Sequence, residues 1–116
     1  MAIEWYSCSN CGKAVRSDNG QPYPNGCPVD SYHNWWRIGE VGDMNYCCSN
    51  CGILVQVEAA PPSDRCSKED HHNWWKLGEV GSNAYRCSNC GLIVKVAGSP
   101  YSDGCTKASY HDWNKI

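Results

Sequence analysis

The segment YSCSNCG at residues 6–12 decides the organisation of this chain, because it returns as YCCSNCG at residues 46–52 and as YRCSNCG at residues 85–91. A lone cysteine and then a histidine follow each copy, with the spacing C-x2-C-x14/15-C-x5-H, and the histidines recur every 39 residues. Such internal similarity indicates a repeat protein. We expect three consecutive units, named modules 1, 2 and 3, at residues 1–42, 43–81 and 82–116.

The chain has 10 cysteines among 116 residues, a density that indicates either a disulfide scaffold or metal sites. Disulfides would not require a histidine at a fixed place in every copy, so metal sites are favoured. Three thiolates and one imidazole suit tetrahedral Zn²⁺; iron is a smaller alternative, because Cys-x-x-Cys-Gly segments also bind iron. We predict three structural Zn²⁺ ions, held by Cys8, Cys11, Cys27 and His33, by Cys48, Cys51, Cys66 and His72, and by Cys87, Cys90, Cys105 and His111.

Two residues of the ligand types fall outside these sets. Cys47 aligns with Ser7 and Arg86, and His71 aligns with two tyrosines, so neither position carries a ligand type in the other modules. We therefore expect both Cys47 and His71 to be surface residues without a metal role.

Alternating apolar side chains follow each Cys-x-x-Cys-Gly segment. Ile53, Val55 and Val57 would share one face of a strand, and residues 92, 94 and 96 repeat the pattern. A further strand is expected from each His-x-Trp segment, and no window has a helical period. These features predict a small, mainly β, metal-stabilised fold.

The paired cysteines, the alternating strand and the distal ligand pair resemble the zinc-ribbon proteins. The resemblance extends over all three modules and implies that each is a short three-stranded antiparallel sheet clamped by Zn²⁺ at one end. The distal C-x5-H pair departs from the C-x2-C that is commoner in that family. Zinc ribbons serve several processes, so the resemblance does not select a function.

Metal would supply most of the stability of each module. Ordering a residue costs roughly 1.5 kcal/mol, and 35–40 residues with few apolar side chains do not offset this cost. A structural zinc ion contributes on the order of 10–16 kcal/mol. Four protein ligands leave no open coordination position, and no other catalytic constellation is visible, so we expect no enzyme.

Tryptophans mark two further positions in the repeat. Trp35, Trp74 and Trp113 each follow a ligand histidine by two residues, and we expect each to pack beside the metal site of its own module. Trp36 and Trp75 occur only where another module follows, together with a Gly-Glu-Val-Gly connection at 39–42 and 78–81. This coincidence predicts that both are buried between modules, near the valine of each connection, in a stiff short rod.

Two classes of function compete for such a protein. Aromatic residues anchor many interfaces, and Trp5, Tyr23 and Tyr101 are candidate exposed contacts for a protein partner or for self-assembly. Nucleic-acid binding is less favoured: residues 1–81 carry 6 basic and 10 acidic side chains, and the formal charge of -2 would become about -5 with three metal–thiolate sites. Only module 3, with four basic and two acidic residues, could offer a basic patch. Metal handling is a third possibility.

The first residues show no basic stretch followed by an apolar run, and no segment approaches the roughly 18 apolar residues of a membrane-spanning helix. We therefore expect a cytoplasmic protein without membrane contact, in a reducing compartment where thiols stay free to bind metal.

Overall fold

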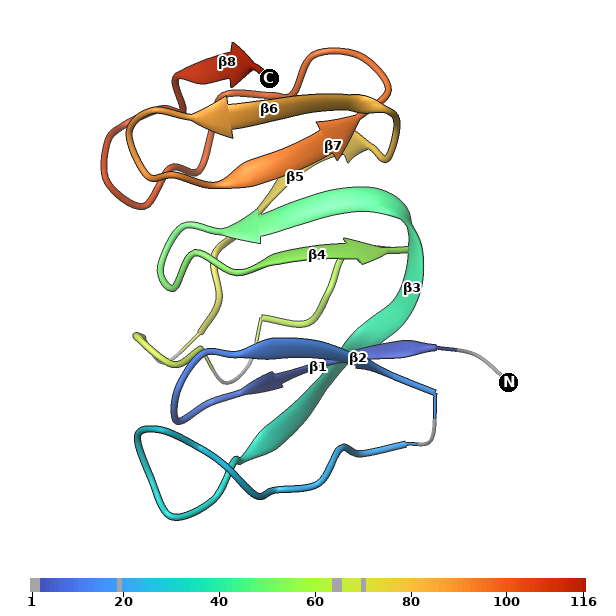
Figure 1. Cartoon of the computed structure of the whole chain (residues 1–116), viewed down its shortest axis with the longest axis vertical. Coiled ribbons are helices and arrows are strands. Elements are labelled where there is room, and N and C mark those ends of the chain that lie inside the picture. Colours follow the sequence, from blue (N-terminus) through green and yellow to red (C-terminus); the bar gives the residue numbers. More distant parts are fainter. Residues whose placement is uncertain (1–2, 19, 64–65, 70) are drawn as a thin grey trace.

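The computed structural model describes residues 3–18, 20–63, 66–69 and 71–116; residues 1–2, 19, 64–65 and 70 lie outside the description. The described residues form β-strands and turns without a helix (Figure 1). In the same part of the chain, no helix is long and apolar enough to cross a membrane. The strands are β1 (Glu4–Cys8), β2 (Ala14–Ser17), β3 (Trp35–Cys48), β4 (Leu54–Val57), β5 (Trp74–Glu79), β6 (Asn83–Cys87), β7 (Ile93–Val96) and β8 (Trp113–Lys115).

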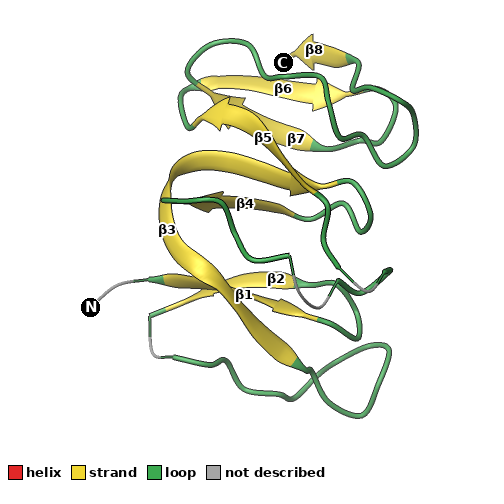
Figure 2. Ribbon diagram, turned by 180° about the vertical axis from the view of Figure 1, so that it is seen from behind, coloured by secondary structure: helices red, strands yellow, loops and turns green. Residues whose placement is uncertain are grey.

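Each module contributes one antiparallel three-stranded sheet. The strand orders are β2-β1-β3, β4-β3-β5 and β7-β6-β8, so the first strand of every module lies between its second and third. The predicted fold class is therefore confirmed. Strand β3 belongs to two modules: its first part pairs with β1 and its second part with β4 and β5. Figure 2 shows β3 as the long curved strand that joins the lower sheet to the middle one.

The three sheets lie one above another along the longest axis of the molecule (Figure 1). The molecule measures 37 × 32 × 22 Å, so it is nearly as wide as it is long. The predicted rod is therefore wrong. Stacking the modules sheet on sheet, instead of end to end along their strands, keeps the assembly short.

The hydrophobic core lies between successive sheets. At the first junction, Trp5 and Ile38 from module 1 pack against Val55 and Val57 from module 2. At the second junction, Leu77 from module 2 packs with Val94 and Val96 from module 3, and Leu77 is completely buried. The predicted alternation of apolar side chains is therefore present in β4 and β7. In each of these strands, one face is buried against the preceding module. Apolar burial stabilises the stack by about 25 cal/mol per Å².

The prediction that both Trp36 and Trp75 are buried between modules is wrong. Trp75 is 37% exposed and Trp36 is half-buried. Their indole N–H groups donate to Ser49 Oγ and Ser9 Oγ in their own modules, which holds each ring over its own Cys-x-x-Cys turn. The Trp75 ring still reaches Gly104 of module 3, where a Cβ would lie 2.5 Å from it. The residues that fill the junctions lie two positions later, at Ile38 and Leu77.

The repeated Gly-Glu-Val-Gly connection brings two backbones into close approach. A Cβ on Gly42 would lie 2.4 Å from the Glu58 nitrogen, and one on Gly81 would lie 2.3 Å from Ala97 Cα. Backbone hydrogen bonds cross both junctions beside these glycines, from Glu58 N to Glu40 O at 3.3 Å and from Ala97 N to Glu79 O at 3.0 Å. The last glycine of each connection is therefore required because no side chain fits there.

Candidate metal centres

The first two candidate ligands of each module stand on a tight turn after the first strand. In module 1, Gly12 N donates to Cys8 O at 2.8 Å, and the same bond recurs at 2.8 Å in modules 2 and 3. The glycine has φ near +80° in every copy, a conformation that L side chains rarely adopt. The turn therefore presents two thiols on one side in each module.

The other two candidate ligands come from the loop before the third strand. The histidine backbone N–H donates to a loop carbonyl in each module, at 2.6 Å to Pro24 O in the case of His33. The tryptophan two residues later packs on the histidine ring, with centroids 4.4, 4.6 and 4.5 Å apart in modules 1, 2 and 3; the rings are stacked in modules 1 and 3 and tilted in module 2. Its indole N–H bonds to a loop carbonyl, as from Trp35 to Tyr23 O at 2.8 Å. The predicted packing of Trp35, Trp74 and Trp113 beside the sites is confirmed.

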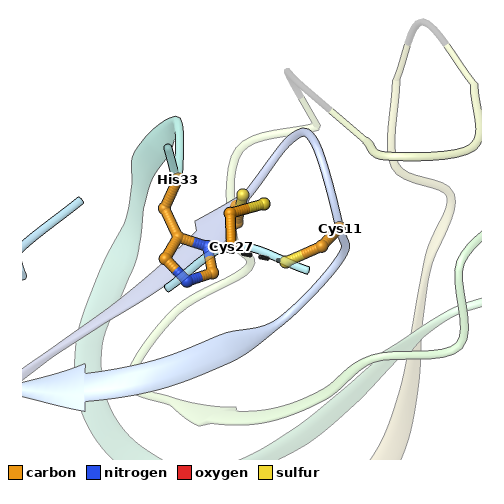
Figure 3. A group of neighbouring side chains, drawn as sticks. Cys11, Cys27 and His33 are labelled. Atoms are coloured by element: carbon orange, nitrogen blue, oxygen red, sulfur yellow. Dashed lines mark hydrogen bonds between the residues drawn. The ribbon is translucent and has the colours of Figure 1, made fainter. Parts of the chain in front are cut away.

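The structure brings the twelve predicted ligands together as three groups of four, with the ligand atoms of each group within 4.8 Å of one another. Figure 3 shows Cys11, Cys27 and His33 pointing toward one another. The histidine Nδ1 lies 3.5, 3.6 and 3.5 Å from the second-cysteine Sγ in modules 1, 2 and 3, and Cys48 Sγ lies 3.9 Å from Cys66 Sγ. Zinc–ligand bonds of about 2.3 Å to sulfur and about 2.0–2.1 Å to nitrogen give tetrahedral edges of about 3.5 Å (S to N) and about 3.8 Å (S to S). The groups therefore have the dimensions of a tetrahedral metal site.

Backbone N–H groups point at the first cysteine of each group and favour its thiolate. In module 1, burial is the largest influence on Cys8 and raises its pKa. Hydrogen bonds from the Cys11 backbone, the His33 ring and the Asn34 backbone outweigh burial and lower the pKa to about 6. The pKa of Cys87 is lowered to about 6 in the same way. These thiols therefore release their proton readily when a metal cation binds the sulfur.

The middle site is more strongly polarised. The Cys51 side chain is the main cause that lowers the pKa of Cys48 to about 3, and the same pairing, with burial, raises the pKa of Cys51. All ten cysteines are free thiols, so the disulfide alternative finds no support in the structure.

The prediction that Cys47 is a surface residue is wrong. Cys47 is 1% exposed and lies at the second junction, with Sγ 3.8 Å from His111 Nε2 of module 3. Burial is the main reason that its pKa rises to about 12, so the thiol is neutral. His71 is exposed, as predicted, and its backbone carbonyl accepts a hydrogen bond from Asn50. Cys47 was missed because repeat alignment identifies shared residues and therefore discards one that differs between copies.

Among the three candidate partner residues, Trp5 is not an exposed contact. It is 9% exposed and packs into the first junction, whereas Tyr23 and Tyr101 are 87% and 59% exposed. Tyr23 borders a cavity of about 470 Å³ on the outer face of module 1, together with Val15, His33 and Trp35. The corresponding faces of modules 2 and 3 are covered by the preceding module. The cavity is thus the uncovered end of the stack.

The chain matches no family model, and no curated protein or solved structure is significantly similar to it. The three clusters suggest metal-binding repeats on their geometry alone.

Proposed function

We propose that the protein is a non-enzymatic repeat protein in which three structural Zn²⁺ ions hold three stacked modules. The observation that carries this proposal is the size of the three groups, whose Nδ1–Sγ separations of 3.5–3.6 Å fit one tetrahedral ion each. Zinc is favoured over iron because each group contains an imidazole beside three thiolates.

The donor set favours a structural role over catalysis. Each group offers one thiolate from a strand end, one from a turn and two ligands from a distal loop, so the ion would join all parts of a module. A catalytic zinc site usually keeps a position for water, and here four protein donors would occupy all four positions. The free thiols fit a reducing cytoplasm, which we propose as its compartment.

We propose that the stack serves as a protein-interaction or assembly module. The uncovered end of module 1 supports this role, because the cavity there combines apolar side chains, Val15 and Trp35, with the 87% exposed Tyr23. Lys13 also borders it, which favours a partner with an acidic and apolar surface. The Arg16 guanidinium lies instead 5.6 Å from the centroid of the Trp5 ring.

Nucleic-acid binding remains the second candidate. Module 3 leaves Arg86, Lys95 and Lys115 exposed on its sheet, and Ile93 beside them is 50% exposed. Phosphate contacts require such cations, but the overall charge is negative.

Elemental analysis tests the metal proposal on protein purified without added metal, and we expect three zinc ions per chain. A zinc content near zero together with five disulfides would overturn the metal proposal.

For the partner, zinc-loaded protein and its Tyr23→Ala variant serve as baits, with retained proteins and nucleic acids identified separately. Loss of one specific protein with Tyr23→Ala supports the interaction role. Retention of nucleic acid that falls steeply with salt and is abolished by Arg86→Ala supports the alternative.

A further inference from the structure

The ligand histidine of module 3 has one ring nitrogen toward its own cluster and the other toward module 2. In module 3, His111 Nδ1 lies 3.5 Å from Cys90 Sγ within its own cluster, while Nε2 lies 3.8 Å from Cys47 Sγ of module 2. Both residues are buried, with exposed fractions of 3% for His111 and 1% for Cys47. The imidazole therefore connects a metal cluster to a side chain of the preceding module.

The chemistry of a bound imidazole fixes the direction of this contact. A cation on Nδ1 leaves the proton on Nε2, and this N–H requires an acceptor because the ring is buried. The Cys47 sulfur is in position to accept it, and the Cys47 S–H points to Gly104 O at 3.8 Å. A chain of two weak hydrogen bonds thus runs from the ring through Cys47 to the loop that carries Cys105.

The first junction carries a serine in place of this cysteine. Ser7 occupies the position of Cys47, and His72 occupies that of His111. Both are buried, at 2% and 3% exposure, and neither Ser7 Oγ nor His72 Nε2 has a hydrogen-bond partner within the described residues. Ser7 and His72 thus do not pair, whereas the larger sulfur of Cys47 reaches His111 at the second junction.

We propose that Cys47 is a positioning residue for the metal site of module 3, which accepts the Nε2–H of His111 and holds the ring with Nδ1 toward the three thiolates. The inference rests on the proposed metal binding. Site 3, formed by Cys87, Cys90, Cys105 and His111, is then completed by module 2 and binds its ion more tightly for having Cys47. Loss of such an outer partner typically costs 10–100-fold in metal affinity.

Two substitutions test the hydrogen bond. Cys47→Val approximately preserves the buried volume but removes the acceptor, whereas Cys47→Ser places at the second junction the short hydroxyl that does not pair with His72 at the first. The full-length zinc-loaded protein and both variants are exposed to increasing EDTA and then alkylated, and peptide mass spectrometry reads the protection of each cysteine. Cys90 reports site 3, Cys51 reports site 2 and Cys11 reports site 1.

We expect three ions per chain in all three proteins at saturating zinc. In Cys47→Val, Cys90 should lose protection at about tenfold less chelator than in the parent protein, while Cys11 should be unchanged. Cys47→Ser should lose protection at a similar chelator concentration, because a serine at the equivalent position does not pair with His72. A ¹⁵N-labelled sample adds a readout that packing does not move: the Nε2–H resonance of His111 should persist in the parent protein and exchange faster in Cys47→Val.

Equal protection of Cys90 in the parent protein and Cys47→Val would overturn the inference, as would full protection of Cys90 in Cys47→Ser. A parent protein with no protected cysteine at any site would instead overturn the proposed metal binding, so the two failures are distinguishable. The converse variant, Ser7→Cys, should raise the chelator concentration at which Cys51 becomes open to alkylation, while that for Cys90 stays unchanged.

Discussion

Trp5 donates its indole N–H to the backbone carbonyl of Gln56, 2.7 Å away across the first junction. At the second junction, Asn45 stands at the equivalent position and donates its amide N–H to Lys95 O at 2.9 Å. Two unlike side chains thus make the same bond to the same carbonyl of the next module. The equivalent position in module 3 is Ala84, which has no side-chain donor. The junction is therefore specified by a donor at one strand position, not by one residue type.

Trp5→Ala should weaken the first junction without releasing metal. The substitution removes a buried ring and leaves the Gln56 carbonyl unpaired, and it should cost about 3–5 kcal/mol of unfolding free energy. Urea denaturation of the zinc-loaded protein measures the loss, and elemental analysis should still find three ions. Tyr23→Ala is the matched control, because Tyr23 is 87% exposed and should change stability by less than about 0.5 kcal/mol. Equal stability of the two variants would contradict the role of Trp5.

The close approach at the connections predicts a strong difference between two glycines. Gly81→Ala places a Cβ 2.3 Å from Ala97 Cα, so one backbone must move and about 1–3 kcal/mol should be lost. Gly98→Ala is the control, because a Cβ there meets nothing within 4 Å. Chemical denaturation compares the two variants. If Gly81→Ala is as stable as Gly98→Ala, the backbone contact does not constrain the junction.

Two adjacent histidines provide a test of the ligand assignment. His72→Ala should lower the zinc content from three ions to two, because His72 Nδ1 lies 3.6 Å from Cys51 Sγ. His71→Ala should retain three ions, since His71 is exposed and contributes a backbone carbonyl to its hydrogen bond with Asn50. Native mass spectrometry counts the ions. Loss of an ion from His71→Ala alone would reverse the assignment.

The sequence was sufficient to predict the sheets and the grouping of the ligands, because both depend on local spacing. A Cys-x-x-Cys-Gly turn and a period-two strand fix the directions of their side chains within a few residues. The stacking depends on which face of each sheet meets the next module, and alternation within one strand does not decide this. Trp5 and Cys47 lie on the covered face of their strands, so both were misjudged as surface residues.

The tryptophan pairs illustrate the same limit. Trp36 and Trp75 occur only before a following module. This rule placed the junctions correctly but did not identify the residues that fill them. Serine hydroxyls of the Cys-x-x-Cys turns hold both indoles, a tertiary contact that has no local sequence signal. Ile38 and Leu77 fill the junctions instead.

Acid should release the ions, because protons compete with the metal for the thiolates. The pKa of Cys8 and of Cys87 is lowered from 9.0 to about 6, where hydrogen bonds outweigh burial. A thiol whose pKa is lowered on folding stabilises the fold above its unfolded pKa, and this contribution is lost as pH falls through the folded value. At the middle site the pKa of Cys48 is lowered while that of Cys51 is raised, so the pair as a whole gives this site no advantage in acid. Elemental analysis after desalting along a pH series should therefore show the zinc content falling from three ions as the pH passes through about 6, and a plateau at one ion down to pH 3 would contradict this.

Leu77 and Ile116 occupy equivalent positions in modules 2 and 3 but opposite surroundings. Leu77 is fully buried against Val94 and Val96, while Ile116 is 66% exposed at the end of the stack. Leu77→Ala should cost about 2–5 kcal/mol, because it leaves a cavity between two sheets. Ile116→Ala should cost less than about 0.5 kcal/mol.

Each module of the Leu77→Ala variant would keep its ion, since the ligands are local to the module, so the weakened part of the structure is the junction. Limited proteolysis should then cut Leu77→Ala near residues 78–81 faster than the parent protein or Ile116→Ala. Trp75→Ala, which removes a partly exposed ring, should fall between the two, and a larger effect from Trp75→Ala than from Leu77→Ala would return the tryptophan to the centre of the junction.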